Sequence, residues 1–218
     1  MTDRIKFYTN PMSRGQIARW ALEESGAPYD QILLEYGTSM KDADYLAINP
    51  MGKVPAIVDK GHVVTECAAI CAYLADAFPD AGLAPHADER ADYYRWLFFA
   101  AGPIEAAVTS RALGWTFDNP QREMMAGFGN FDRPLEVLAG VLAARDYICG
   151  ARFTMADVYV GSQVDWGLQF GTFPDRKEFQ DYAARIRQRE AYQRSKAIDG
   201  ALIAEAEAAK AASEAGEG

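Results

Sequence analysis

Hydrophobic and polar positions change their period twice at the start of the chain. Residues 4–9 alternate apolar and polar side chains and stop at an Asn-Pro pair, which predicts a short strand ended by a turn. Residues 14–25 then repeat apolar side chains at a helical period, and residues 29–35 again have the pattern of a strand. Because a helix connects the two strands, we expect them to pair in parallel through a right-handed crossover.

Two further strands and a helix complete the predicted N-terminal domain. The segment of residues 36–54 is irregular, with room for a short helix. Residues 55–59 and 62–65 predict short strands, and the Lys-Gly connection between them favours antiparallel pairing. Residues 66–78 predict a helix with one apolar face. The order β-α-β followed by β-β-α is typical of a thioredoxin-like α/β fold, which we assign to residues 1–79.

The rest of the chain predicts helices alone. Residues 80–88 form a linker rich in proline and glycine, and residues 89–200 predict an all-α domain. The first helix of this domain is expected to kink at a Gly-Pro pair. Residues 201–218 are mostly alanine and charged side chains, which predicts a flexible tail. Further helices are expected at residues 120–128, 133–144, 155–170 and 179–186.

Composition and charge narrow the range of functions. The 218 residues include 31 acidic and 22 basic side chains, a formal net charge of −9. This argues against sequence-independent binding of nucleic acid, which needs a basic surface. No apolar run approaches the roughly 20 residues of a transmembrane helix, and no signal peptide is evident, so we expect a cytoplasmic protein with no membrane partner. The three cysteines and two histidines lack the spacing of a disulfide framework or a metal site, so we expect no metal.

Two motifs at a fixed spacing carry a family resemblance. Residues 49–59 have the sequence Asn-Pro-Met-Gly-Lys-Val-Pro-Ala-Ile-Val-Asp, and residues 63–70 have Val-Val-Thr-Glu-Cys-Ala-Ala-Ile. This pair resembles the N-P-x-G-x-V-P-x-L and E-S-x-A-I motifs of the cytosolic glutathione S-transferase family. The likeness extends from about residue 4 to about residue 195. It implies a thioredoxin-like domain that holds glutathione as co-substrate, an all-α domain, and a homodimer.

The resemblance also assigns binding roles around these motifs. In the family the proline after valine is cis, so Val54-Pro55 would turn the Val54 backbone outward to pair with the cysteinyl backbone of glutathione. Glu66 would pair with the γ-glutamyl ammonium, and the N–H of Cys67 would bind the γ-glutamyl carboxylate. Lys53 would face the glycyl carboxylate. Cys67 replaces the family serine, and because a thiol is a weak donor we expect weakened glutathione binding. Apart from the resemblance, Val54-Pro55 could simply begin a strand, and Glu66 could simply stabilise its helix.

The first loop must supply the group that ionises the glutathione thiol. A free thiol has a pKa of about 8.5, so half-ionisation at pH 7 needs roughly 2 kcal/mol, which one hydrogen bond to a charged group can supply. Ser13 is the leading candidate because it precedes the first helix, where serine-type family members keep their donor, although a serine there can be a helix cap alone. Tyr8 and Asn10 are the alternatives. The loop holds no cysteine, which argues against glutathionyl-cysteine exchange.

The helical half contains a folding motif and candidate pocket residues. Thr154 and Asp157 form a predicted capping box, to which we assign no catalytic duty. The resemblance places the second substrate against this domain, although aromatic side chains at helical spacing are more often core. The candidate lining residues are Phe98, Phe99, Trp115 and Trp166, with Tyr94 and Phe117 as further aromatic side chains.

The leading hypothesis is therefore a glutathione S-transferase that conjugates the glutathione thiolate to a hydrophobic electrophile, as in detoxification. One alternative is another glutathione reaction at the same site, such as peroxide reduction, isomerisation or dehalogenation. The other is a non-catalytic binding protein with the same fold, because fold alone does not decide function.

Overall fold

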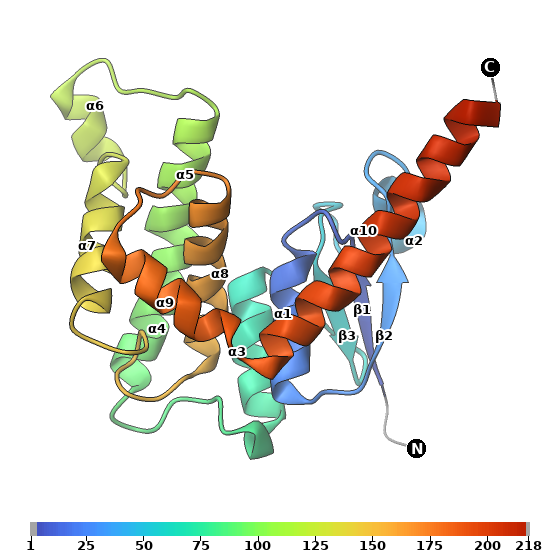
Figure 1. Cartoon of the computed structure of the whole chain (residues 1–218), viewed down its shortest axis with the longest axis horizontal. Coiled ribbons are helices and arrows are strands. Elements are labelled where there is room, and N and C mark those ends of the chain that lie inside the picture. The colour runs from blue at the N-terminus through green and yellow to red at the C-terminus, as the bar shows by residue number, and fades with distance from the viewer. Residues whose placement is uncertain (1–3, 217–218) are drawn as a thin grey trace. The chain divides into compact units, whose positions relative to one another are not determined.

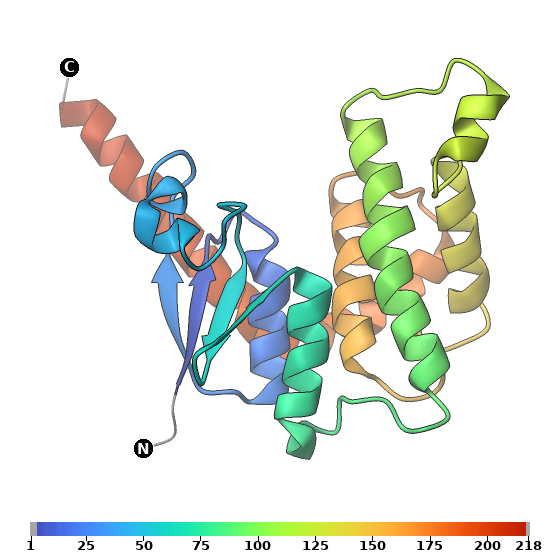
Figure 2. The same cartoon turned by 180° about the vertical axis from the view of Figure 1, so that it is seen from behind.

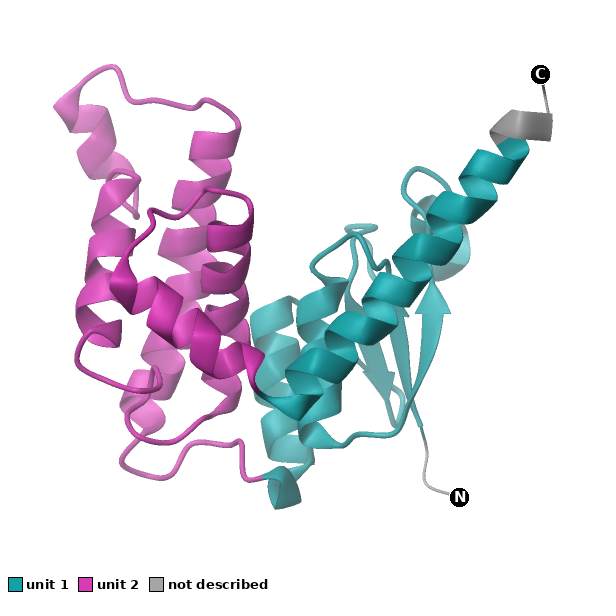
Figure 3. Cartoon of the chain, in the orientation of Figure 1, with its two compact units in different colours: residues 1–81, 189–218 teal, residues 82–188 magenta. Residues whose placement is uncertain are grey.

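A computed structural model describes residues 4–216 of the chain. It divides into two compact units, residues 1–81 together with 189–218, and residues 82–188 (Figure 3). The sequence assigned residues 189–200 to the helical domain, whereas the structure groups them with the sheet. The reason is that the last helix of the chain packs along the first helix of the first unit.

The first unit is built on a four-stranded sheet of β1 (Ile5–Thr9), β2 (Tyr29–Leu33), β3 (Ala56–Asp59) and β4 (His62–Thr65). The strand order is β2-β1-β3-β4 (Figures 1 and 2). β1 pairs with β2 in parallel, and β3 is antiparallel to both β1 and β4. This confirms the predicted thioredoxin-like topology, in which alternate side chains of β1 are buried in the core.

Two helices lie side by side on one face of this sheet, α1 (Gly15–Ser25) and α3 (Cys67–Ala77) (Figures 1 and 2). α1 ends at Gly26, whose φ of 65° is the left-handed conformation that glycine adopts without a Cβ clash. The segment between β2 and β3 contains a short 3₁₀ helix, Ser39–Lys41, and a short α-helix, α2 (Ala43–Leu46). Another short 3₁₀ helix, Pro79–Ala81, follows α3.

The C-terminal part of the chain forms one long helix, α10 (Glu190–Gly216). The sequence predicted a flexible tail from residue 201, but the structure continues the helix to Gly216. The first half of α10 packs on α1, and residues 204–213 are exposed. Alanine, glutamate and lysine are strong helix formers, which favours helix here even where little apolar surface is buried. Residues 217 and 218 of the predicted tail lie outside the described residues.

The second unit consists of helices. α4 (Arg90–Phe99) continues through a π-helical turn, Ala100–Ile104, into α5 (Glu105–Ala112). The Gly-Pro pair, at which the sequence predicts a kink, lies in this π-helical turn, and Pro103 is inside it. The remaining helices are α6 (Pro120–Met125), α7 (Asp132–Leu142), α8 (Met155–Gln169) and α9 (Lys177–Arg187). Among residues 4–216, none of the helices combines the length and apolar content needed to cross a bilayer.

The start of α8 confirms the predicted capping box. The Asp157 carboxylate is fully buried and accepts hydrogen bonds from the backbone N–H of Thr154 at 2.8 Å and of Ile148 at 2.7 Å. It also accepts from the Tyr182 hydroxyl of α9 at 2.8 Å. Burial raises the pKa of Asp157 to about 6, against the opposing effect of these hydrogen bonds. Asp157 therefore joins α8 to α9 and to the preceding loop, which is a folding role.

Candidate functional site

The loop between β1 and α1 is shaped by Asn10. Its side-chain Nδ2 donates to the Leu34 carbonyl at 2.8 Å, and its Oδ1 accepts from the Met12 N–H at 2.9 Å. Both ends of the amide thus bind backbone groups, as is typical of an asparagine that forms a turn. Asn10 was one of three predicted thiol-activating residues, and the structure gives its amide a role in holding the loop.

Ser13 closes the same loop and leads into α1. Its hydroxyl donates to the Asn10 carbonyl at 2.6 Å and accepts from the Gly15 N–H at 2.9 Å. The structure places Arg14, and not Ser13, at the N-cap position of α1. The bond from Gly15 still satisfies one of the free N–H groups at the helix start, from the residue before the N-cap. The side chain is half-buried. To donate to a thiolate, the hydroxyl must therefore release the Asn10 carbonyl.

Gly15, the first residue of α1, is a glycine because β1 and α1 approach each other closely here. A Cβ atom at Gly15 would lie 2.0 Å from the Thr9 Oγ1 and 3.1 Å from the Asn10 carbonyl oxygen. Glycine is thus required for the end of β1 to pass beneath the first turn of α1. The Thr9 hydroxyl is fully buried and has no hydrogen-bond partner among the described residues.

Two further side chains hold the loop through its carbonyl groups. The Gln16 Nε2 donates to the Pro11 carbonyl at 2.7 Å, and the Tyr36 hydroxyl donates to the Met12 carbonyl at 3.2 Å. With the Ser13 bond, three consecutive carbonyls of the loop each accept a hydrogen bond from a side chain. These bonds hold the loop in one conformation. A side chain that must come within hydrogen-bond distance of a thiol needs such a fixed position.

Tyr8, the tyrosine alternative for thiol activation, lies in β1 and packs against the core. Its ring centre is 5.5 Å from that of Tyr45, and it borders the buried cluster that contains Leu34, Met40 and Ala56. The aromatic body of Tyr8 therefore has a packing role, whereas Ser13 lies in the loop itself.

The segment before β3 contains the predicted cis peptide bond between Val54 and Pro55. The preceding carbonyl, of Lys53, accepts from the Tyr45 hydroxyl at 2.5 Å and from the Asn49 Nδ2 at 2.7 Å. Among the described residues, the Val54 N–H and C=O have no hydrogen-bond partner. An extended ligand backbone can pair with such a free N–H and C=O as an added strand. The side chain of Lys53 is exposed.

Glu66 is held in an unusual backbone conformation at the corner between β4 and α3. Its φ of 64° and ψ of 119° lie where residues with a Cβ atom are rare. Strain of this kind costs of order 1–3 kcal/mol and is concentrated at functional sites. The side chain is exposed. The sequence did not reveal this conformation, because no glycine or asparagine marks it.

Cys67 opens α3 and is buried, with 8% of its surface exposed. Its Sγ lies 3.5 Å from the Arg14 carbonyl, so the start of α3 lies against the start of α1. The structure thus brings the Cys67 end of the predicted glutathione-binding motif next to the Ser13 loop. The other two cysteines, Cys71 and Cys149, are buried in the cores. This burial raises the pKa of Cys71 well above its ordinary value and that of Cys149 to about 12.

The aromatic residues predicted to line the second-substrate pocket are spread over the helical unit. Phe98 is 70% exposed, Phe99 packs edge-on against Trp96, and Trp166 packs against Phe170. Trp115 lines a cavity of about 340 Å³ beside the end of α5. The other residues around this cavity include Phe117, Phe128, Phe131, Arg111 and Asn130.

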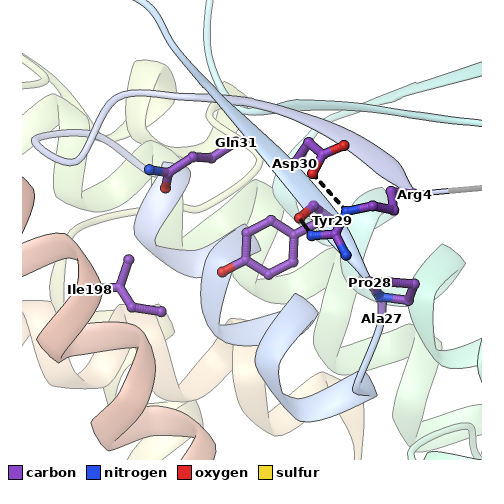
Figure 4. A pocket seen from close by; sticks show the side chains of 7 residues that line it. All are labelled: Arg4, Ala27, Pro28, Tyr29, Asp30, Gln31 and Ile198. Atoms are coloured by element: carbon purple, nitrogen blue, oxygen red, sulfur yellow. Dashed lines mark hydrogen bonds and ion pairs between the residues drawn. The ribbon is translucent and has the colours of Figure 1, made fainter.

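A second depression lies at the β2 edge of the first unit, between Tyr29 and Ile198 of α10 (Figure 4). Its charged side chains, Arg4 and Asp30, pair with each other at 2.6 Å and are more than half exposed. Because these charges already compensate one another, we assign it no ligand. Among the described residues, no cluster of histidine, cysteine and acidic side chains could hold a metal ion.

Sequence reasoning missed the residues that support the loops. Gln16, Tyr36, Tyr45 and Asn49 bind loop carbonyls that lie close only after folding. For Asn49 a signal was available, because asparagine before a turn commonly binds nearby backbone groups. For Gln16, Tyr36 and Tyr45 the sequence contained no such signal, because nothing in the local pattern distinguishes them from ordinary residues of a helix or loop.

Both halves of the chain match known domain families in order. Residues 4–76 match the family described as glutathione S-transferase, N-terminal domain, and residues 102–190 match glutathione S-transferase, C-terminal domain. Glutathione S-transferase GstA of Escherichia coli O157:H7 is 28% identical over 167 residues, covering 74% of this chain and 82% of the relative. Glutathione S-transferase 3 of Zea mays is 30% identical over 165 residues, covering 70% of this chain and 73% of the relative.

Solved structures agree with this assignment over nearly the whole chain. A glutathione transferase from Methylococcus capsulatus str. Bath has a TM-score of 0.73 and 28% identity, covering 90% of this chain and 98% of its own. A sphingomonad glutathione S-transferase complexed with glutathione has a TM-score of 0.70 and 27% identity, covering 89% and 98%. With two domain families matched in order and a relative 30% identical, the chain belongs to the glutathione S-transferase family of enzymes.

Proposed function

We propose that this protein transfers glutathione to apolar electrophiles, with glutathione bound by the first unit. The observation that carries the proposal is the free backbone N–H and C=O of Val54 beside the cis bond to Pro55. This arrangement suits the cysteinyl backbone of glutathione, which pairs with it as a short added strand. A sphingomonad relative of the same fold is complexed with glutathione, which supports the assignment of the ligand.

The charged ends of glutathione meet complementary groups in this proposal. The exposed Glu66 carboxylate pairs with the γ-glutamyl ammonium, and the strained backbone of Glu66 is the cost of aiming it there. The N–H of Cys67, at the start of α3, binds the γ-glutamyl carboxylate. The exposed Lys53 ammonium pairs with the glycyl carboxylate.

Ser13 activates the thiol in this proposal. When the thiol loses its proton, the Ser13 hydroxyl turns from the Asn10 carbonyl and donates to the thiolate, while the Gly15 N–H stays on the serine oxygen. A hydrogen bond to an ionised group is worth about 1.5–3 kcal/mol, against about 0.5–1.5 kcal/mol for a neutral pair. The turn is therefore favourable only when the sulfur is charged, which lowers the thiol pKa.

The aromatic cavity of the helical unit supports an apolar second substrate. Trp115, Phe117, Phe128 and Phe131 surround it, and the Arg111 guanidinium lies 4.1 Å from the centre of the Phe131 ring. Its volume of about 340 Å³ is at the lower end of small-molecule sites. We infer that it takes a small aromatic or unsaturated electrophile. Trp115→Ala should then raise KM for the electrophile and leave KM for glutathione unchanged.

Ser13→Ala tests the catalytic assignment, with Ser13→Thr as the matched control that keeps the hydroxyl. The assay is conjugation of glutathione to 1-chloro-2,4-dinitrobenzene between pH 6 and 10, after calorimetric titration shows that each variant binds glutathione. We expect kcat of Ser13→Ala to fall by about 5- to 12-fold at pH 7, the factor equivalent to the net gain of about 1–1.5 kcal/mol when the Ser13 hydroxyl exchanges the Asn10 carbonyl for the thiolate. The deficit should shrink above pH 9, where the thiol ionises unaided. An unchanged pH profile would remove Ser13 from the mechanism.

Cys67→Ser tests the placement of glutathione. A serine hydroxyl restores a good donor beside the γ-glutamyl carboxylate, so glutathione should bind about 2- to 10-fold more tightly, as expected for one neutral hydrogen bond. Cys67→Ala, which lacks a donor, is the matched control and should not tighten binding. If Cys67→Ser weakens binding, the γ-glutamyl group lies elsewhere.

A further inference from the structure

A chain of hydrogen bonds connects the C-terminal helix to the thiol-activating loop. The Lys196 Nζ of α10 donates to the Gln16 Oε1 at 2.9 Å, and the Gln16 Nε2 donates to the Pro11 carbonyl at 2.7 Å. Lys196 and Gln16 are both half-buried. Lys196 and Gln16, 180 residues apart in the sequence, thus meet beside the Asn10–Ser13 turn, and Gln16 bonds to the Pro11 carbonyl within that turn.

The donor and acceptor chemistry of the three groups determines which way each hydrogen bond from Lys196 through Gln16 to Pro11 runs. A lysine ammonium only donates, and a backbone carbonyl only accepts. The Gln16 amide between them must therefore present its oxygen to Lys196 and its NH₂ group to Pro11. Lys196 selects the amide orientation that the loop needs, because the reversed orientation would face an NH₂ group to the ammonium and an oxygen to the carbonyl.

Contacts of neighbouring residues hold this part of α10 against α1. Tyr192 and Asp199 lie one helical turn to either side of Lys196 on the same face of α10. Tyr192 packs edge-on against Trp20 of α1 at 5.1 Å between ring centres, and Asp199 forms a buried ion pair with Arg19 of α1. α10 therefore lies along α1 throughout this stretch, as both views in Figures 1 and 2 show.

The loop depends on this support because of where the Gln16 bond falls. Pro11 lies between Asn10, whose carbonyl accepts the Ser13 hydroxyl, and Met12, whose carbonyl accepts the Tyr36 hydroxyl. The Gln16 bond fixes the peptide group between these two. If that peptide group rotates, the Asn10 carbonyl and the Ser13 hydroxyl lose the alignment on which thiol activation depends.

We propose that Lys196, acting through Gln16, is a positioning residue for the thiol-activating loop, so that α10 forms part of the active site. The inference rests on the proposed function of Ser13 and adds a residue that does not touch glutathione. It assigns α10 a role in the reaction besides its packing on α1.

The test uses Lys196→Met and Gln16→Met, which keep side-chain length and remove one partner each, together with the double variant. In the full-length protein we expect each single variant to lower kcat/KM for glutathione with 1-chloro-2,4-dinitrobenzene by about 2- to 10-fold, because both act on the loop through the one neutral hydrogen bond from Gln16 to the Pro11 carbonyl. The pH profile should move to higher pH. The double variant should lose no more than either single variant, because both act on one chain of bonds.

A matched control separates positioning from general damage to α10. Arg194 lies two residues before Lys196 and pairs with Glu23 at 3.2 Å, at a half-exposed position. Arg194→Met removes a cation from the same helix and should leave the pH profile unchanged. Thermal unfolding of all variants should lie close to that of the wild type.

The pH profiles of these variants and the activity of the wild type distinguish three cases. If Lys196→Met moves the pH profile and Gln16→Met does not, the lysine acts through its charge on the thiolate, and the proposed chain is wrong. If neither variant moves the profile while the wild type is active, the inference fails and the function of Ser13 stands. If the wild-type protein neither binds glutathione nor conjugates it, the proposed function fails first.

Discussion

A buried ion pair between α1 and α10 gives the sharpest test of how the first unit is held together. Arg19 and Asp199 are almost fully buried, and the Arg19 Nε lies 2.8 Å from the Asp199 Oδ1. Arg19 also donates to the Tyr29 hydroxyl at 3.3 Å, and its guanidinium lies 5.2 Å from the centre of the Phe7 ring. Replacing Asp199 with leucine leaves this guanidinium buried without its counter-ion.

The size of the effect follows from the partners that remain. Removing one member of a buried ion pair costs about 3–5 kcal/mol, because an uncompensated charge stays in low-dielectric surroundings. The Tyr29 hydroxyl accepts from Arg19 and itself donates to Glu23 at 2.8 Å, so an acidic group stays nearby. We therefore expect about 3 kcal/mol for Asp199→Leu, the lower end of that range. Replacing Arg19 by methionine as well removes both charges and should bring the cost to about 1 kcal/mol or less.

Hydrogen exchange of peptides from α1 and α10 measures this change locally, without requiring the whole chain to unfold in one step. A loss of about 3 kcal/mol should speed exchange of the most protected α10 amides by about 100-fold. The control is Asp30→Asn. It breaks the exposed Arg4–Asp30 pair, whose 2.6 Å distance is similar, and should cost no more than about 1 kcal/mol.

Two results would refute this reasoning. If the double variant exchanges as fast as Asp199→Leu, the cost comes from lost packing and not from an unpaired charge. If Asp199→Leu stays within a factor of about three of the wild type, α10 is held by its other contacts. One of these contacts is the Arg189–Glu24 ion pair, in which two guanidinium nitrogens donate to the two carboxylate oxygens at 2.6 and 2.7 Å.

Three further predictions concern single positions. Burial raises the pKa of Asp157 from 3.8 to about 6, so the folded chain binds its proton more tightly and this group's stabilisation is lost as pH rises between these values. Urea unfolding across pH 4–7 should show a fall of about 2 kcal/mol that Asp157→Asn abolishes. Gly15→Ala should lower the free energy of unfolding by about 1–3 kcal/mol, and Thr9→Ala in the same chain should recover part of it. Glu66→Gly should stabilise the fold by about 1 kcal/mol in thermal unfolding while glutathione titration shows weakened binding.

The sequence predicted those parts of the fold that local patterns determine. β1, α1 and α3 follow from apolar periodicity, and the antiparallel pairing of β3 with β4 follows from a short connection. The length of α10 was not predicted, because its second half has helix-forming residues but little apolar surface. Its packing on α1 depends on partners such as Arg19 and Asp199, 180 residues apart, whose meeting no local pattern encodes.

The site shows a similar division between motif and geometry. The resemblance to a family predicted the cis bond between Val54 and Pro55, which is present. The positive φ of Glu66 and the hydrogen bond from Ser13 to the Asn10 carbonyl could not be predicted. Both depend on backbone positions to within a few tenths of an ångström. A sequence indicates which side chains are available, and only the folded backbone decides which groups they bind.

The bond between Ser13 and the Asn10 carbonyl limits how far the thiol pKa can fall. In the proposed reaction this neutral bond is exchanged for one to a thiolate, a net gain of about 1–1.5 kcal/mol. The start of α1 adds about 0.3–1 kcal/mol through its dipole. The total is about 2 kcal/mol, which is what half-ionisation at pH 7 requires and leaves little surplus. A loop with so narrow a margin must be held in one conformation, and the bonds from Gln16 and Tyr36 to its carbonyls supply that restraint.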